Sequence, residues 1–333
     1  METIRRAKRR IAVSLGKQGT DSRLYRTVNA LNLFFFHRDD RMQLIHYGNE
    51  DPDRTYYVIR PSSTAEGLLS SYFTVVDHIR WALDRQYVPY VDFESKRCQY
   101  YTGREINGTV NAWEYYFEQP AGLTKTQIAK KKNVLLSGIE KGAQQKTKTK
   151  FESSFERYKG EACRKIYESI PVRQEIQAEA ERKVRELFGP GPVLGVLLRG
   201  TDYVALKPKG HPIQPTLETA EEKIDEFLAK YPIERICVVT EEYAYFEALK
   251  QKYGDRVFSS DDDFVREYKP GTYISDTMTD DPYQRGKNYL IRLLLLAQCD
   301  YFVSGITNGS LFAYCNRKQE YKDCFWFDLG LYE

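Results

Sequence analysis

Short apolar runs alternate with amphipathic stretches from residue 193 onward, and this alternation restricts the fold more than any other feature. The apolar runs have the composition of buried strands, and the amphipathic stretches carry apolar residues at helical spacing. Strands that alternate with helices form parallel sheets, because each helix returns the chain to the edge where the previous strand began. We therefore predict an α/β fold in which residues 193–333 form a doubly wound, Rossmann-like domain. The predicted strands are residues 193–200, 235–241, 256–261, 301–305 and 324–329, and the predicted helices are residues 217–231, 243–253, 282–298 and a segment that starts at Ser310.

A second unit of the same kind precedes this domain. Residues 55–61 (TYYVIRP) and 87–93 (YVPYVDF) have the pattern of strands, and a polar loop over 62–67 is followed by an amphipathic helix over 68–86. Strand, loop, helix and strand in this order form the building block of a parallel sheet. We therefore expect an N-terminal α/β domain over residues 1–121. The apolar stripe of its helix consists of Leu68, Tyr72, Val75, Val76, Ile79, Ala82 and Leu83.

The segment between the two units is long, charged and helical in pattern. It covers residues 122–192 and ends in Gly-Pro-Gly-Pro at 189–192, a clear break. We expect helices here that link two domains, which a chain of 333 residues is long enough to contain. Near the N-terminus, residues 29–48 fit either a helix or two short strands.

The composition excludes several classes of protein. A formal net charge of +3 does not indicate a nucleic-acid partner, and no apolar run approaches the roughly 20 residues that span a bilayer. The six cysteines form no C-x-x-C pair, so we expect reduced structural thiols and a cytoplasmic protein. The basic residues 1–10 fit either a solvated tail or contact with the inner membrane surface. The 26 tyrosines fit either a Tyr-rich core or recognition of rings and hydroxyls.

Candidate ligand-binding residues stand at the carboxyl ends of the predicted strands, where open α/β sheets bind ligands. Arg199 follows the first strand of the C-terminal unit, and its planar guanidinium suits phosphate oxygens. An ion pair with Asp202 or Asp300 is an equally good interpretation of Arg199. The strand ends are residues 199–202 (RGTD), 240–242 (TEE), 259–261 (SSD) and 304–310 (SGITNGS).

The last strand end is small and rich in hydroxyls, and it leads into a predicted helix. Backbone N–H groups at a helix N-terminus, with the hydroxyls of Thr307 and Ser310, can bind an anion, although the same residues also form an ordinary helix cap. We expect this segment and Arg199 to face one edge of the sheet and to hold a phosphate together. Lys207 and His211, in the proline-rich loop after RGTD, are placed to reach a phosphate or a reacting hydroxyl, but a lone loop histidine is more often structural.

The sequence lacks the motifs of two other nucleotide-binding classes. It contains no G-x-x-x-x-G-K-[ST] and no G-x-G-x-x-G after a strand, which argues against a P-loop hydrolase and a dinucleotide oxidoreductase. Aspartates at 261–263 and 280–281 are candidates for a divalent cation site. Since Arg199 and a helix N-terminus can neutralise a phosphate, we expect no metal.

Four segments resemble motifs of the α1,6- and O-fucosyltransferase superfamily, in the right order. Residues 193–203 (VLGVLLRGTDY) resemble its H-x-R-x-x-D type phosphate motif, whose Arg holds the β-phosphate of GDP-fucose. Residues 299–314 (CDYFVSGITNGSLFAY) are similar to its last motif, a strand followed by small polar residues. Residues 60–83 resemble its N-terminal loop and helix, and residues 111–120 (NAWEYYFEQP) its Trp-containing stretch. The whole chain also resembles bacterial proteins of capsule, lipopolysaccharide or O-antigen assembly.

The resemblance implies a GT-B-like architecture, with two Rossmann-like domains and the donor bound mainly to the second. It also implies inverting transfer without a metal. The sequence departs from the family at five positions. Leu197 and Gly200 replace a histidine and a second arginine, Tyr203 and Lys207 stand where the core enzymes have Lys and Glu, and Arg292 stands where an aspartate reads guanine. GDP-fucose is therefore the first of several candidate donors.

Together these features predict a fucosyltransferase-like glycosyltransferase with no cofactor besides its nucleotide-sugar donor and with a glycan or lipid-linked acceptor in surface polysaccharide assembly. A nucleotide-sugar epimerase or hydrolase and a non-catalytic nucleotide-sugar-binding protein are the alternatives. Asp202 is the first candidate for the general base, and orientation of Arg199 is its alternative role. The predicted site residues are Asp202, His211 and Glu66 for catalysis, Arg199, Lys207, Thr307, Asn308, Gly309 and Ser310 for the donor phosphates, Thr240, Glu241 and Asp261 for the nucleotide, and Trp113 and Glu114 for the acceptor side.

Overall fold

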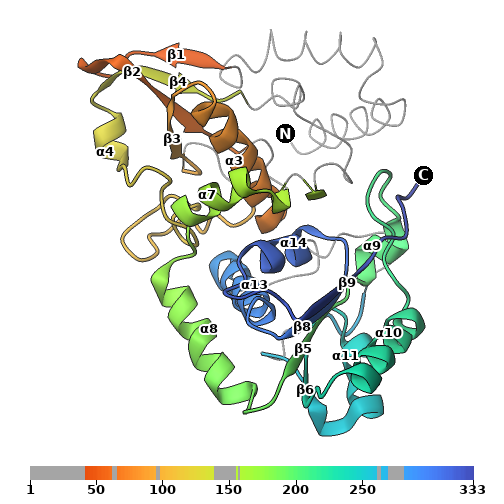
Figure 1. Ribbon diagram of the computed structural model, residues 1–333. Helices are drawn as coiled ribbons and strands as arrows, with labels where there is room; N and C mark the ends of the chain where they lie inside the picture. Colours follow the sequence, from red (N-terminus) through yellow and green to blue (C-terminus); the bar gives the residue numbers. More distant parts are fainter. Residues whose placement is uncertain are drawn as a thin grey trace.

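The computed structural model of the chain shows two sheets with helices packed against both (Figure 1). Within the described residues, one sheet has four strands and the other five, and helices of both units lie between them. The predicted α/β class with two units of parallel strands is confirmed, with one antiparallel strand at the edge of the first sheet. The structure describes residues 42–61, 66–94, 98–138, 155–156, 158–260, 264–268 and 281–333.

The first sheet has the strand order β1-β4-β2-β3. β2 pairs in parallel with β3 and β4, and β1 lies antiparallel to β4 at the outer edge. The helix α3 connects β2 to β3, as the sequence pattern predicts. β1 answers part of the question over residues 29–48, since the described part contains a strand, while residues 29–41 and loop residues 62–65 lie outside the described ranges. The elements are β1 (Gln43–Ile45), β2 (Glu50–Ile59), α3 (Leu68–Leu83), β3 (Val88–Val91) and β4 (Lys131–Leu136).

The predicted apolar stripe of α3 is buried except at its last residue. Leu83 is 52% exposed, so its place in the stripe was wrong. It is the final residue of the helix, and the chain turns away at Asp84, beyond the region where α3 packs on the sheet. The buried members of the stripe are Leu68, Tyr72, Val75, Val76, Ile79 and Ala82.

The segment 122–192 contains a strand where we predicted only helices. Val134 in β4 is completely buried, and Lys131 forms ion pairs with Glu50 and Asp51 of β2 at 3.0 and 2.6 Å. The lysine run at 130–132 has the pattern of a solvated helix face, but Lys131 lies in a strand and pairs with carboxylates of the neighbouring strand. The boundaries predicted at 121 and 192 stay predictions, but β4 belongs to the first sheet by its pairing. Three helices also lie in this segment, α4 (Lys125–Ile128), α7 (Glu161–Ser169) and α8 (Gln174–Leu187), and residues 139–154 lie outside the described ranges.

The second sheet has the order β7-β6-β5-β8-β9, and every pair of neighbouring strands is parallel. Each strand and helix predicted after residue 193 is present, and a short additional helix, α9, follows β5. The strands are β5 (Val193–Leu197), β6 (Arg235–Val239), β7 (Val257–Phe258), β8 (Tyr301–Gly305) and β9 (Asp323–Phe327). The helices are α9 (Thr201–Leu206), α10 (Leu217–Lys230), α11 (Tyr243–Tyr253), α13 (Pro282–Leu296) and α14 (Asn308–Cys315).

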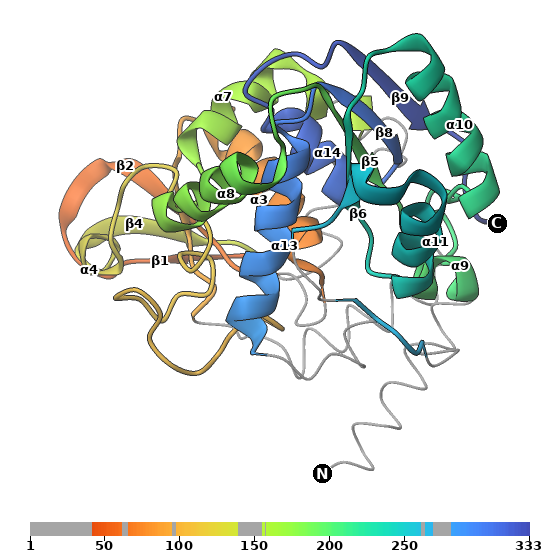
Figure 2. The same ribbon diagram turned by 90° about the horizontal axis from the view of Figure 1, so that it is seen from below.

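Helices cover both faces of this second sheet (Figure 2). α10 and α11 pack on one face, and α8, α13 and α14 pack on the other. The residues of β5 alternate between the two faces. Val196 packs in the cluster with α10 and α11, and Leu197 packs in the cluster with α8, α13 and α14. A strand buried on both sides explains why the sequence of β5 is almost entirely apolar.

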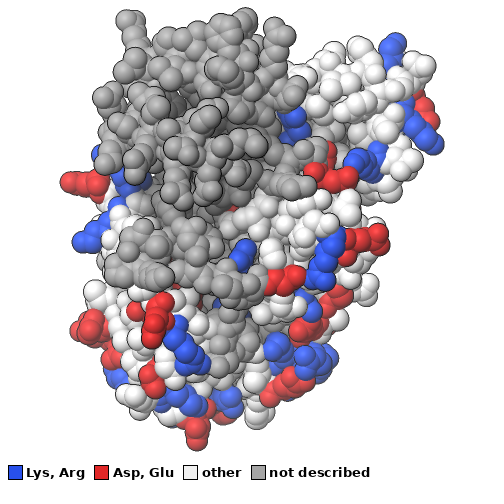
Figure 3. Space-filling view, turned by 180° about the vertical axis from the view of Figure 1, so that it is seen from behind, with Lys and Arg blue, Asp and Glu red and all other residues white. Residues whose placement is uncertain are grey.

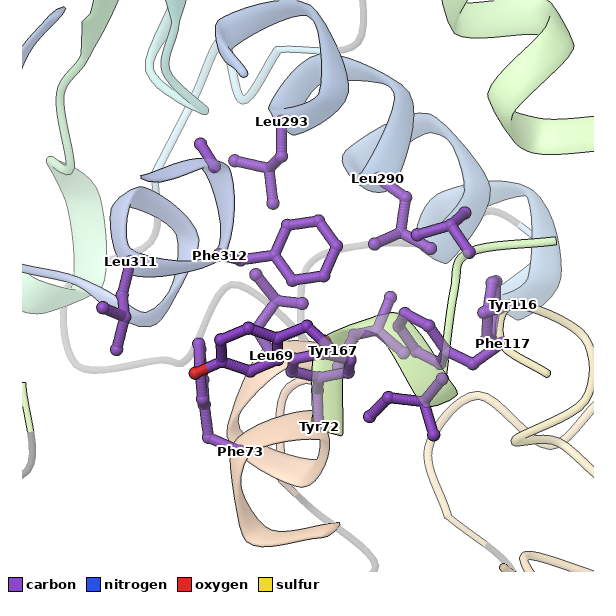
Figure 4. Packing of buried hydrophobic residues seen from close by; sticks show 14 of the residues in the cluster. Leu69, Tyr72, Phe73, Tyr116, Phe117, Tyr167, Leu290, Leu293, Leu311 and Phe312 are labelled. Carbon is purple, nitrogen blue, oxygen red and sulfur yellow. The ribbon is translucent and has the colours of Figure 1, made fainter. Parts of the chain in front are cut away.

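One aromatic cluster joins the two sheets into a continuous core (Figure 4). The ring of Tyr72 on α3 lies 4.9 Å from that of Phe117, 5.1 Å from that of Phe312 on α14 and 6.2 Å from that of Tyr167 on α7. All four side chains are buried. Several tyrosines therefore serve the core, as one of the two interpretations of the tyrosine surplus expects.

The described surface carries both signs of charge. Figure 3 shows Lys and Arg side chains interspersed with Asp and Glu over the described part of one face. Among the described residues, no helix is both long and apolar enough to cross a membrane. The basic residues 1–10, for which we considered membrane contact, lie outside the described ranges.

Candidate functional site

The strand order places a topological switch point between β5 and β8. From β5 the chain proceeds outward to β6 and β7, then returns to β8 on the opposite side of β5. The connections after β5 and β8 therefore leave the sheet toward opposite faces, which is the arrangement at which open α/β sheets bind ligands. Leu197 pairs with Ser304 at this edge, so the RGTD turn and the 304–310 turn are neighbours.

Arg199 lies at the carboxyl end of β5 between two carboxylates. Its guanidinium contacts Asp202 at 2.8 Å and Glu241 at 3.3 Å, and its side chain is 26% exposed. Burial opposes the positive charge, but Glu241 and Asp202 outweigh it and hold the pKa of Arg199 above its ordinary value. The predicted pairing with Asp202 is confirmed. Asp300 instead pairs with Lys322 at 2.7 Å.

Two glutamates that follow β6 shape the turn after Arg199. The N–H of Gly200 and the hydroxyl of Thr201 both donate to Glu241 at 3.0 Å, and the N–H of Thr201 donates to Glu242 at 3.0 Å. Thr201 has a φ of 43°, in the left-handed region that side chains adopt at a cost of about 1 kcal/mol or more. A Cβ on Gly200 would collide with the Glu242 carboxylate. The two glutamates therefore hold a strained turn that only glycine at 200 permits.

The first turn of α14 is closed by a capping box. The Thr307 hydroxyl accepts from the N–H of Ser310 at 3.0 Å, and the Ser310 hydroxyl accepts from the N–H of Thr307 at 2.9 Å. The helix-cap interpretation of these hydroxyls is confirmed. The N–H groups of Asn308 and Gly309 follow at the start of the helix, where the helix dipole favours an anion.

Two tyrosines that the sequence did not single out complete the surroundings of Arg199. Tyr289 of α13 lies against the start of α14. Its hydroxyl is so close to Gly309 that a Cβ on this glycine would collide with it. Burial raises the pKa of Tyr100 of the N-terminal unit, and the positive charges of Arg285 and Arg199 oppose this rise. Both interactions join residues that are distant in the sequence, so local patterns carry no sign of them.

The loop after α9 is tied to the site through Tyr203. The Tyr203 hydroxyl lies within hydrogen-bonding distance of His211, 3.0 Å from Nδ1, and its ring lies 5.2 Å from the guanidinium carbon of Arg199. The backbone of Tyr332 pairs with this loop, donating to His211 and accepting from Gly210 at 2.9 and 2.8 Å. Lys207 is exposed and has a φ of 43°. His211 therefore lies near the site, with Tyr203 between it and Arg199.

Other predicted residues are engaged in contacts within the protein. Trp113 is 2% exposed, and its indole N–H donates to the carbonyl of Glu118 at 3.1 Å, so its ring belongs to the core. Glu114 accepts from Thr109 and Gln119 at 2.6 and 2.7 Å. Thr240, which is 3% exposed, accepts from the backbone of Glu242 at 3.1 Å.

For Glu66 the structure shows a backbone contact, and most of the acidic segments lie outside the described ranges. The backbone carbonyl of Glu66, just before α3, accepts from the Gln99 side chain at 2.5 Å. Asp261, the whole 261–263 run and Asp280 lie outside the described ranges. Among the residues that the structure does describe, no group of three or more His, Cys, Asp or Glu side chains is arranged to hold a metal ion.

The comparisons with known proteins found similar solved structures only. No protein-family model matches the chain, and no curated protein matches it. NodZ alpha-1,6-fucosyltransferase soaked with GDP-fucose has 14% identity and a TM-score of 0.49, over 83% of this chain and 96% of that one. Fucosyltransferase NodZ from Bradyrhizobium has 15% identity and a TM-score of 0.46, over 79% and 93%. POFUT1 in complex with GDP has 13% identity and a TM-score of 0.45, over 82% and 98%. We therefore derive the function from the site itself.

Proposed function

We propose that this protein is a glycosyltransferase that binds the diphosphate of a nucleotide-sugar donor between Arg199 and the first turn of α14. One observation carries the proposal. A guanidinium at the end of β5 and the N-terminus of α14 after β8 both lie at the switch point of the second sheet. Both groups suit an anion, and a site at this edge is where a nucleotide binds in this type of sheet.

The chemistry of sugar transfer fits these groups. The bond between the sugar carbon and the phosphate oxygen breaks, and its electron pair leaves with the diphosphate. Arg199 and the N–H groups of Asn308 and Gly309 stabilise the charge that develops there. The acceptor hydroxyl forms the new bond and gives its proton to a base.

Asp202 suits the role of positioning Arg199 better than that of the base. Its carboxylate contacts the guanidinium at 2.8 Å and it is 7% exposed, so it is already engaged and shielded from an acceptor. His211 is more exposed, and Tyr203 holds its Nδ1. We propose His211 as the first candidate for the proton acceptor and Glu66 as the second.

GDP-fucose is the first donor to test, because the sequence resemblance points to it. The residues that would read the guanine in that family are not matched. Arg292, at the position of the base-reading aspartate, is 6% exposed within α13, and Leu197 is 4% exposed in the core. The nucleotide is therefore chosen by other contacts, and a screen must include several bases.

A melting-temperature screen tests the proposal directly. GDP-, UDP-, CMP- and dTDP-sugars are added to the full chain, and a ligand at about 100 times its Kd stabilises the fold by about 2.7 kcal/mol. We expect one nucleotide class to raise the melting temperature by several degrees and Arg199→Lys to reduce that shift. Arg182→Ala, which removes an exposed ion pair on α8, is the matched control.

Two results would contradict the proposal. One is the absence of a shift with every nucleotide sugar. The other is release of the nucleoside diphosphate at the same rate with and without any glycan acceptor, which would indicate a hydrolase.

A further inference from the structure

The Tyr289 hydroxyl stands at the switch point, against the first turn of α14. A Cβ on Gly309 would collide with this hydroxyl and would lie 3.4 Å from Cδ1 of Leu197, at the end of β5. The phenol therefore lies beside the carboxyl ends of both strands that form the site. It comes from α13, an element to which the proposed function has assigned no role.

The surroundings of Tyr289 keep its hydroxyl a hydrogen-bond donor. Burial raises the pKa of Tyr289, and the positive charge of Arg199 opposes this rise without reversing it. The phenol is thus protonated at neutral pH and close enough to Arg199 to share its electrostatic field. Within the part of the chain that the structure describes, the hydroxyl makes no hydrogen bond.

A buried group beside the same turn lacks a partner among the residues that the structure describes. The side-chain N–H₂ of Gln214 donates to the carbonyls of Pro212 and Ile306 at 3.0 and 3.2 Å, which fixes the orientation of the amide. Its Oε1 then lies beside Gly305 and finds no donor among the described residues, although the side chain is only 5% exposed. Buried acceptors are rarely left unpaired, so this turn is short of a donor that a ligand hydroxyl, a ligand N–H or a water supplies.

We propose that the Tyr289 hydroxyl donates a hydrogen bond to the diphosphate of the nucleotide-sugar donor, beside Arg199 and the N–H groups of Asn308 and Gly309. This role rests on the proposed function and adds a further ligand to the same anion site. It also explains the glycine at 309, because any side chain there would push the phenol out of the first turn of α14.

The experiment measures the Kd of GDP and of inorganic pyrophosphate by titration calorimetry with the full chain and three variants. Tyr289→Phe removes one oxygen and is expected to weaken both ligands by the same factor, about tenfold, as for the loss of one hydrogen bond to a charged group. Gly309→Ala is expected to weaken both further, because its methyl group displaces the phenol. In the double variant Tyr289→Phe/Gly309→Ala the collision is relieved, so the alanine should add little to the effect of the phenylalanine.

Gly191→Ala is the matched control. It creates the same kind of collision, with the carboxylate of Glu234, just before β5 and so at the opposite edge of the sheet from the site, and it should leave the Kd of GDP and pyrophosphate unchanged. Wild-type Kd values in Tyr289→Phe, or a Gly309→Ala effect of equal size in both backgrounds, would overturn the role of Tyr289 while the proposed function stands. Failure of the wild-type chain to bind any nucleoside diphosphate, nucleotide sugar or pyrophosphate would overturn both.

Discussion

At the scale of single residues, the site is a balance between one cation and two internal anions. Arg199 contacts Asp202 at 2.8 Å and Glu241 at 3.3 Å, so a diphosphate that binds as proposed would share the guanidinium with them. We expect Glu241 to give up its contact with Arg199 more easily than Asp202 does. Its contact is longer, and its other oxygen keeps the hydrogen bonds from Gly200 and Thr201. Asp202 then stays in place and keeps the fork of Arg199 turned toward the ligand.

The buried histidine of α3 gives a prediction about pH. His78 is 7% exposed, its Nδ1 lies 2.7 Å from the Tyr57 hydroxyl, and burial lowers the pKa of His78 to about 4. The unfolded chain therefore binds more protons than the folded one between pH of about 4 and 6.5, and stability falls as the pH drops through that window. We expect a loss that approaches about 3 kcal/mol near pH 4, seen in urea unfolding curves. A His78→Asn variant should show a shallower fall over the same window, and an equal slope in both proteins would refute the assignment.

At the scale of elements, the second sheet follows from local pattern and the first follows only in part. β5, β6 and β8 are apolar runs buried on both faces, and such runs are visible in a sequence. The sequence pattern did not predict β4, because Lys131 of this strand is held by carboxylates of β2. One of them, Asp51, is 80 residues away in the sequence. Tyr289 and the loop-holding contacts of Glu242 could not be predicted for the same reason. The positions of Arg199 and the 304–310 turn at one edge of the sheet could be predicted, because strand ends can be located from the pattern alone.

The capping box of α14 gives a prediction for one element. Thr307→Ala removes the hydroxyl that accepts from Ser310 and should cost about 1 kcal/mol of stability. It should also weaken donor binding, because the first turn of α14 loses its fixed geometry. Thr307→Ser keeps the hydroxyl and should behave as the wild-type chain in both melting temperature and donor Kd. Unchanged donor affinity in Thr307→Ala would show that the capping box stabilises the helix without contributing to donor binding.

At the scale of the whole molecule, one aromatic core holds the two sheets against each other. Tyr72, Phe117, Tyr167 and Phe312 come from four parts of the chain and are all buried (Figure 4). The hydroxyl of Tyr116 donates to the carbonyls of Pro282 and Tyr283 at 3.0 and 3.2 Å, which ties the N-terminal unit to the start of α13. Tyr100, whose ring lies 6.0 Å from that of Tyr116, is therefore held by packing between the two units.

The shared core predicts that a single truncation weakens both units at once. Phe312→Ala should cost about 3–5 kcal/mol, as for other buried aromatic side chains, and should lower one cooperative melting transition. Leu83→Ala is the matched control, since that side chain is 52% exposed and its loss should change stability by less than about 0.5 kcal/mol. Calorimetry that resolves two independent transitions in the Phe312 variant, with one at the wild-type temperature, would contradict a shared core.

The most direct test of the central claim is the rate of donor turnover in Arg199 variants. With the donor found in the screen, Arg199→Ala should lower the release of nucleoside diphosphate in the presence of acceptor by about 100-fold or more, because the leaving group loses its charge partner. Arg199→Lys keeps the charge but not the planar fork, so its turnover rate should lie between those of the wild-type chain and of Arg199→Ala. Far-UV circular dichroism should show both variants folded. Wild-type turnover in folded Arg199→Ala would contradict the assignment of this arginine to the donor diphosphate.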